Sequence, residues 1–140
     1  MHLVPATILS AAVTILAVLF YFYTSLLVGR MRGKHDIKAP AVTGNTEFEC
    51  AYRVQMNTLE HIVIFLPLLW IATIFFNGIG WLAPLFGLVW IVGRFLYMTG
   101  YMTDPSKRSN GFLIAGLALV GLLALSIIGV VTAWMATGSL

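Results

Sequence analysis

Residues 48–76 read FECAYRVQMNTLEHIVIFLPLLWIATIFF, a polar stretch that continues directly into an apolar one. Among the polar residues of its first half, Arg53, Asn57 and Glu60 are spaced four and three positions apart. At about 100° per residue they fall within roughly a 60° arc of one helix face. A charge near the hydrocarbon core of a bilayer is costly and persists mostly where it is paired or functional. This stripe offers a cation, an amide and a carboxylate, a set that suits a small zwitterionic ligand.

The composition indicates a membrane protein. Of the 140 residues, 60% are hydrophobic and 9% are charged, whereas a soluble domain has about 25% charged residues. We expect one integral membrane domain over residues 1–140 with an all-α fold. The net charge of +3 lies in short basic clusters, which indicates membrane topology rather than nucleic-acid binding. The single cysteine, Cys50, excludes an internal disulfide, and we expect no metal site.

Four apolar spans are expected to form helices, at about 5–28, 47–76, 81–103 and 109–137. Each exceeds the roughly 20 residues that cross a bilayer, so the pattern predicts a four-helix transmembrane bundle. Thr46 followed by Glu49 has the form of a capping box, with Thr46 as the N-cap residue of the second helix. A core formed by 140 residues is small, which favours an oligomer.

Basic residues in the connecting segments predict the topology. Six of them follow the first and third spans, and the turn at 77–80 has none. The six are Arg30, Arg32, Lys34, Lys38, Lys107 and Arg108. By the positive-inside rule, both basic segments are cytoplasmic and both termini lie outside. The sequence is compatible with a bacterial inner membrane and with the endoplasmic reticulum.

The third span has a polar stripe of its own. Arg94, Tyr97 and Tyr101 share one face within about 60°. Measured along each helix from the turn at 77–80, Glu60 lies roughly 25 Å away and Tyr97 roughly 24 Å away. The two stripes are therefore level, and we expect one site open to the cytoplasmic side. We expect Arg94 to have a structural role, with Glu60 as its candidate partner.

Three motifs resemble the MAPEG family, the membrane-associated proteins of eicosanoid and glutathione metabolism. Residues 52–60, YRVQMNTLE, are similar to the family's pattern of Arg, Asn and Glu on its second helix. Residues 87–101, GLVWIVGRFLYMTGY, resemble its third helix, and residues 104–109, DPSKRS, resemble the next loop in the microsomal glutathione transferase 3 branch. The other two helices match only in hydropathy.

The resemblance implies a homotrimer of four-helix subunits with glutathione bound between neighbours. By position, the residues that would bind the tripeptide are Arg53, Asn57, Glu60 and Tyr97, completed by Gln55 and Tyr101. Arg108 corresponds to an arginine that stabilises the thiolate, and Arg32 or Arg30 corresponds to an arginine of the first helix. His61 departs from the pattern, because several members have an aromatic residue there that helps to cradle the tripeptide.

These residues predict a glutathione-dependent transferase or peroxidase that acts in detoxification. Arg53 can bind a carboxylate, Glu60 an ammonium, and Arg108 the thiolate, which is the reactive form of the thiol. The second substrate would be a lipophilic electrophile or a lipid hydroperoxide that arrives from the bilayer. Taken singly, each of these residues could also have a structural role without a ligand. Arg53 could be an interfacial cation, the two tyrosines could belong to an aromatic belt, and Arg108 could be a topology signal.

Two other functions are compatible with the same membrane-protein composition. One is a non-catalytic lipid-binding scaffold of the same fold, which loss of the glutathione-binding residues would favour. The other is a small four-helix transporter of cationic drugs with an intramembrane Glu60. Arg53 and Arg94 oppose the transporter, because they would repel a cationic drug.

Overall fold

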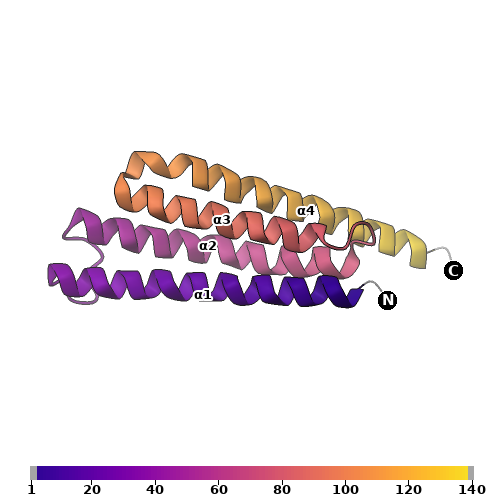
Figure 1. Cartoon of the computed structure of the whole chain (residues 1–140), viewed down its shortest axis with the longest axis horizontal. Helices are drawn as coiled ribbons and strands as arrows, with labels where there is room; N and C mark the ends of the chain where they lie inside the picture. Colours follow the sequence, from indigo (N-terminus) through magenta and orange to yellow (C-terminus); the bar gives the residue numbers. More distant parts are fainter. Residues whose placement is uncertain (1–2, 139–140) are drawn as a thin grey trace.

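The computed structural model describes residues 3–138, most of which belong to four long helices arranged as an elongated bundle (Figure 1). The elements are α1 (Leu3–His35), α2 (Thr46–Phe75), α3 (Leu82–Thr103), the short 3-10 helix η1 (Pro105–Arg108) and α4 (Ser109–Thr137). All four α-helices are long and apolar enough to cross a membrane. The predicted all-α transmembrane bundle is therefore confirmed.

The two connections that carry basic residues lie at the same end of the bundle. Figure 1 shows the α1–α2 loop and η1 at one end, and the start of α1, the end of α4 and the α2–α3 turn at the other. This arrangement follows from four helices that alternate in direction. The basic side chains of both connections therefore lie at the same end of the bundle, which is the arrangement that the positive-inside rule uses to predict orientation.

Helix α1 extends seven residues beyond the predicted end at 28, to His35. Arg32, Lys34 and His35 form its last turn, where cations interact favourably with the helix dipole. Buried Val28 with partly buried Met31 packs against Phe48 of α2, which holds this extension in place. Arg30, Arg32 and Lys34 therefore lie on a helix and not in a loop, since apolar patterning alone ends before these residues.

Helix α2 begins one residue earlier than the predicted capping box implies. Its N-cap residue is Asn45, whose Oδ1 accepts hydrogen bonds from the backbone N–H groups of Glu47 (2.9 Å) and Phe48 (3.4 Å). Glu49 does bind back to the preceding turn, but its Oε1 accepts from the N–H of Gly44 at 2.9 Å. Asn45 thus takes the role that the sequence assigned to Thr46, because an asparagine oxygen caps at least as well as a threonine.

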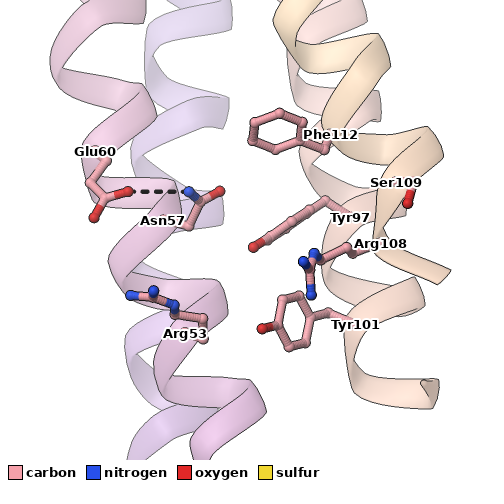
Figure 2. A pocket seen from close by; sticks show the side chains of 8 residues that line it. All are labelled: Arg53, Asn57, Glu60, Tyr97, Tyr101, Arg108, Ser109 and Phe112. Atoms are coloured by element: carbon pink, nitrogen blue, oxygen red, sulfur yellow. Dashed lines mark hydrogen bonds between the residues drawn. The ribbon is translucent and has the colours of Figure 1, made fainter. Parts of the chain in front are cut away.

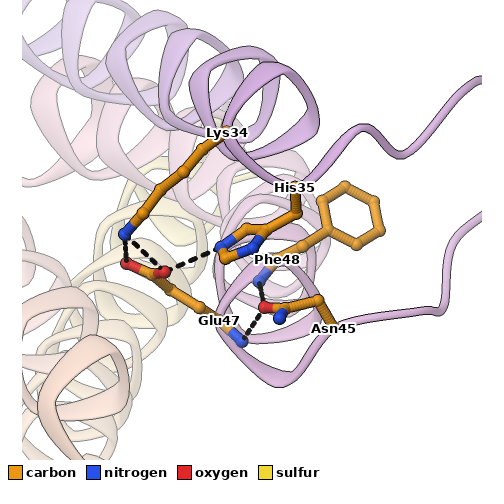
Figure 3. Close-up of polar contacts among 5 residues, drawn as sticks. All are labelled: Lys34, His35, Asn45, Glu47 and Phe48. Atoms are coloured by element: carbon orange, nitrogen blue, oxygen red, sulfur yellow. Dashed lines mark hydrogen bonds and ion pairs between the residues drawn. The ribbon is translucent and has the colours of Figure 1, made fainter.

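An ion cluster ties the end of α1 to the start of α2 (Figure 3). The Nζ of Lys34 lies 2.7 Å from Oε2 of Glu47, and the Nε2 of His35 lies 2.8 Å from the same oxygen. On the neighbouring face, the Cζ of Arg32 lies 4.7 Å from the ring centroid of Phe48. These contacts fix the angle at which α2 starts, and therefore the direction of the polar stripe that begins at Arg53, about one and a half turns further along.

Helices α3 and α4 approach each other at the level of the polar residues because glycines remove the side chains between them. A Cβ added to Gly93 would lie 2.5 Å from the backbone nitrogen of Ala115. A Cβ added to Gly111 would lie 2.6 Å from the Cα of Tyr97 and 2.7 Å from the carbonyl oxygen of Gly93. Three residues before Gly93 on α3, Trp90 stacks on Phe65 of α2 with ring centroids 4.0 Å apart. The crossing places the first turns of α4 directly beside Tyr97.

Candidate functional site

A cavity of about 470 Å³ lies between α2 on one side and α3 with the start of α4 on the other (Figure 2). Its lining contains two arginines, a carboxylate, an amide, a serine and three aromatic rings. The lining residues are Arg53, Asn57, Glu60, Tyr97, Tyr101, Arg108, Ser109 and Phe112. Six of these eight were predicted as site residues from the sequence, so both predicted stripes do meet in one place.

The wall formed by α2 carries the polar stripe in the predicted order. Arg53, Asn57 and Glu60 follow one another along the helix and face the cavity (Figure 2). The Nδ2 of Asn57 donates a hydrogen bond to Oε2 of Glu60 at 3.2 Å. Arg53 and Glu60 are exposed to the cavity, while Asn57 is half-buried. A ligand can therefore reach a cation and an anion on the same wall.

The opposite wall combines aromatic rings with a cation. The rings of Tyr97 and Tyr101 meet edge to face, with centroids 5.5 Å apart and planes at 65°. The Cζ of Arg108 lies 5.4 Å from the centroid of Tyr101, and Phe112 lies 6.3 Å from Tyr97. Arg108 is the last residue of η1, so its position depends on this short helix. The wall sets a guanidinium and two phenol groups opposite the stripe of α2.

The cap of η1 fixes the segment that carries Arg108. The Oδ1 of Asp104 accepts the backbone N–H of Ser106 at 2.9 Å. This hydrogen bond holds the pKa of the Asp104 carboxyl below its usual value. Asp104 lies outside the cavity lining, so its influence on the site is exerted through η1.

Arg94 is not paired with Glu60, which corrects the sequence-based expectation. Its side chain is 0% exposed and lies behind the cavity wall. Nη1 donates to Oδ1 of Asn57 at 3.0 Å, Nη2 donates to Oγ1 of Thr58 at 2.8 Å, and Cζ lies 4.2 Å from the ring centroid of Tyr97. The amide of Asn57 stands between the two charges, because it is bonded to both. The expected structural role of Arg94 is confirmed, with different partners.

Two predicted site residues, Gln55 and Arg32, lie outside this cavity. Gln55 is two positions from Arg53 and from Asn57, about 200° around the helix, and its Nε2 donates to Oγ of Ser25 on α1 at 2.9 Å. Arg32 donates from Nη1 to the carbonyl oxygen of Ala41 at 2.8 Å. Gln55 of α2 therefore faces α1, Arg32 of α1 binds the α1–α2 loop, and neither lines the cavity.

Ser109 and Phe112 line the cavity but were missed by sequence reasoning. They belong to an apolar helix whose hydropathy gave no reason to single them out. The available signal was spacing, because Phe112 follows Arg108 by four residues and such pairs share a helix face. Phe112 also packs edge to face against His61 with ring centroids 5.5 Å apart, and Nδ1 of that histidine is buried without a hydrogen-bond partner among residues 3–138.

The chemistry of the lining defines what it can bind. Two arginines and one carboxylate give the cavity a net positive charge with a separate anionic group, which suits a ligand with two negative groups and one positive group.

A second cavity of about 350 Å³ shares Arg53 and Tyr101 with the first and extends towards the start of α2, beside Cys50. Among residues 3–138, no group of His, Cys, Asp and Glu side chains is arranged to bind a metal ion.

Comparison with known proteins identifies the family. The model of the MAPEG family matches residues 10–128. Human microsomal glutathione S-transferase 2 is 42% identical over 125 residues, which cover 86% of this chain and 84% of that protein. Leukotriene C4 synthase of Cavia porcellus is 40% identical over 121 residues, covering 86% and 79%. An uncharacterized Synechocystis protein is 42% identical over 108 residues, 77% of each chain. The chain is therefore an integral, multi-pass membrane protein that belongs to the MAPEG family.

Proposed function

We propose that the protein is a glutathione-dependent membrane transferase or peroxidase, with glutathione as co-substrate. The observation that carries the proposal is the convergence of Arg53, Glu60 and Arg108 on one cavity of about 470 Å³ in a membrane-spanning bundle. Two of the relatives are named as a glutathione S-transferase and a leukotriene synthase, which supports a transferase. The motif resemblance points to the same co-substrate.

The lining complements the charged groups of glutathione. Glutathione has two carboxylates, an ammonium and a thiol. Arg53 binds a carboxylate with its two-pronged guanidinium, and Glu60 accepts the ammonium from the same wall. Asn57 lies between them and supplies a further polar contact. With these anchors on α2, the thiol is directed towards the opposite wall.

Arg108 is the proposed activator of the sulfur. A free thiol with a pKa of about 8.5 is mostly protonated at neutral pH, and the thiolate is the nucleophile. Lowering that pKa by about two units requires roughly 2.7 kcal/mol of differential stabilisation. The guanidinium of Arg108, beside Tyr101, supplies a cation, and the N-terminus of α4 at Ser109 adds a partial positive charge. Tyr97 and Tyr101 offer hydroxyl donors on the same wall.

The second substrate is proposed to be lipophilic. In conjugation the thiolate forms a C–S bond with an electrophilic carbon while the leaving group of that carbon departs with the bonding electrons. In reduction it attacks a hydroperoxide oxygen, the O–O bond breaks to release the alcohol, and a second glutathione converts the resulting sulfenic acid to glutathione disulfide and water. The lipophilic substrate reaches the thiolate from the bilayer. Phe112, about half exposed at 47%, forms an apolar part of the lining. The second cavity beside Cys50 lies towards the basic end of the bundle, where water-soluble glutathione would enter. The basic segments are proposed to be cytoplasmic and both termini external.

A homotrimer is the proposed assembly, and the positions of Gln55 and Arg32 support it. Within one subunit these residues face away from the cavity, at Ser25 and Ala41. If they contact glutathione, as the family pattern implies, they must do so from a neighbouring subunit. The site then lies between subunits, and each subunit supplies residues to two sites.

Calorimetric titration with glutathione of the purified protein in detergent tests this function. We expect the wild type to bind, and Glu60→Gln and Arg53→Ala each to bind more weakly by about 1.5–3 kcal/mol, the value of a hydrogen bond to a charged group. Asp36→Asn is the matched control, because Asp36 is an exposed carboxylate that lines neither cavity. Unchanged affinity in both cavity variants would contradict the assignment, and a wild type without affinity would favour the scaffold.

A further inference from the structure

One arginine touches the cavity wall from behind without lining the cavity. Arg94 is 0% exposed, so it cannot contact a ligand. Among residues 3–138 it forms no ion pair, and its two terminal nitrogens donate to Asn57 and Thr58. A buried charge is costly unless it is compensated, and its retention points to a role that an apolar side chain could not fill. The role follows from its partner, because Asn57 does line the cavity.

The chemistry of the neighbours fixes the orientation of the Asn57 amide. A guanidinium can only donate hydrogen bonds, and an ionised carboxylate can only accept them. Asn57 stands between one of each: its Oδ1 lies 3.0 Å from Nη1 of Arg94, and its Nδ2 lies 3.2 Å from Oε2 of Glu60. The flipped amide would oppose donor to donor and acceptor to acceptor. One N–H of Nδ2 is used by Glu60, and the other remains for the cavity.

We propose that Arg94 is a positioning residue that makes the Asn57 amide a fixed hydrogen-bond donor and thereby selects a ligand with a carbonyl or carboxylate oxygen at this point. The inference rests on the proposed glutathione site, and glutathione carries such oxygens beside its charged groups. Arg94 also lies 4.2 Å from the ring centroid of Tyr97. One buried guanidinium therefore contacts a residue of each cavity wall, on α2 and on α3.

A double-mutant cycle in glutathione binding tests the inference. Wild type, Asn57→Ala, Arg94→Met and the double variant are titrated by calorimetry. Each single variant should bind glutathione about tenfold more weakly, since each removes the oriented donor. In the Asn57→Ala background, Arg94→Met should weaken glutathione binding by less than about threefold, because the amide through which Arg94 acts is already absent.

The cycle separates positioning from a general effect on the fold. If Arg94→Met weakens binding by the same factor in both backgrounds, or leaves the affinity of the wild-type background unchanged, the inference is overturned. Arg94→Lys takes the place of Arg94→Met if the latter does not give a folded protein by size-exclusion chromatography and thermal unfolding. The same coupling is expected with lysine, since one ammonium does not reproduce the two directed bonds of the guanidinium.

A measurement without ligand distinguishes failure of this inference from failure of the proposed function. In protein labelled isotopically at asparagine, the Asn57 side-chain amide is the resonance that is missing from Asn57→Ala. Replacement of Arg94 should shift this resonance and speed its exchange with solvent. An unchanged resonance overturns the inference whatever the binding data show. A shifted resonance in a protein whose wild type does not bind glutathione refutes the proposed ligand and leaves the positioning role supported.

Discussion

Replacement of Gly111 by alanine should separate the two helices that form one wall of the cavity. The added Cβ would lie 2.6 Å from the Cα of Tyr97, whereas ordinary contact begins at 3.4 Å. The obstacle is backbone on α3, and a backbone cannot rotate away as a flexible side chain can. The backbone nitrogen of Tyr97 would lie closer still, so the helices must open by about 1 Å or more, which moves Arg108 and Phe112 relative to Tyr97.

The magnitude of this effect follows from the displacement. Overpacking of a close-packed contact costs typically about 1–3 kcal/mol of stability. A misplacement of about 1 Å between a substrate and its catalytic groups lowers the rate by roughly a hundredfold. Gly111→Ala should therefore destabilise the protein and reduce turnover far more than it reduces glutathione affinity, because Arg53, Asn57 and Glu60 on α2 are not displaced directly.

Thermal unfolding in detergent and glutathione conjugation of a lipophilic electrophile measure the two effects. Gly116→Ala is the matched control on the same helix, because a Cβ there meets nothing within 4 Å. That variant should be neutral or slightly more stable, since alanine is the better helix former by about 0.5–1 kcal/mol. The reasoning is refuted if Gly111→Ala and Gly116→Ala have the same unfolding temperature and the same turnover.

Three further predictions concern the polar end of the bundle. Arg108→Ala should reduce turnover at least about tenfold and raise the apparent thiol pKa of bound glutathione towards ~8.5, while changing glutathione affinity little. If this variant keeps the wild-type thiolate titration and turnover, the tyrosines and not Arg108 activate the thiol. A cysteine introduced at Lys107 should resist a membrane-impermeant thiol reagent in intact cells, and ready labelling would overturn the proposed orientation. Asp104→Ala should lower turnover and thermal stability, because the cap of η1 is lost. The pKa of Asp104 is lowered in the fold by its hydrogen bond with Ser106, so the cap's contribution is present above the carboxyl's ordinary pKa of 3.8 and is lost as the pH falls through the lowered value. Unfolding temperatures of Asp104→Ala and wild type that stay equally far apart in strong acid would contradict this cause.

Periodicity along single helices was sufficient to predict most residues that line the cavity. The spacing of Arg53, Asn57 and Glu60 specified one helix face, and the count from the short turn placed them level with Tyr97, as the cavity confirms. Both inferences use only the fixed rise and rotation of an α-helix. The same rules indicate that Gln55 points about 200° away from its neighbours, so its absence from this cavity also follows from the sequence.

Contacts between helices were less accessible from the sequence. The bond from Arg94 to Asn57 depends on the rotation of α3 relative to α2, which hydropathy does not specify. Phe112 enters the lining because Gly93 and Gly111 let α4 approach α3, and a glycine in an apolar helix does not reveal which neighbour it admits. The end of α1 at His35 depended on packing against Phe48, beyond the last apolar residue of the span.

The most direct test of the central claim is the ultraviolet absorbance of the glutathione thiolate on mixing the wild-type protein with glutathione across a pH series. We expect a thiolate signal at neutral pH, in proportion to the bound tripeptide, with a midpoint about two pH units below that of free glutathione. Addition of a non-reactive analogue that lacks the thiol should abolish the signal by competition. A bound thiol that titrates like the free one, or no thiolate signal at saturating glutathione, would show that this cavity does not activate the thiol.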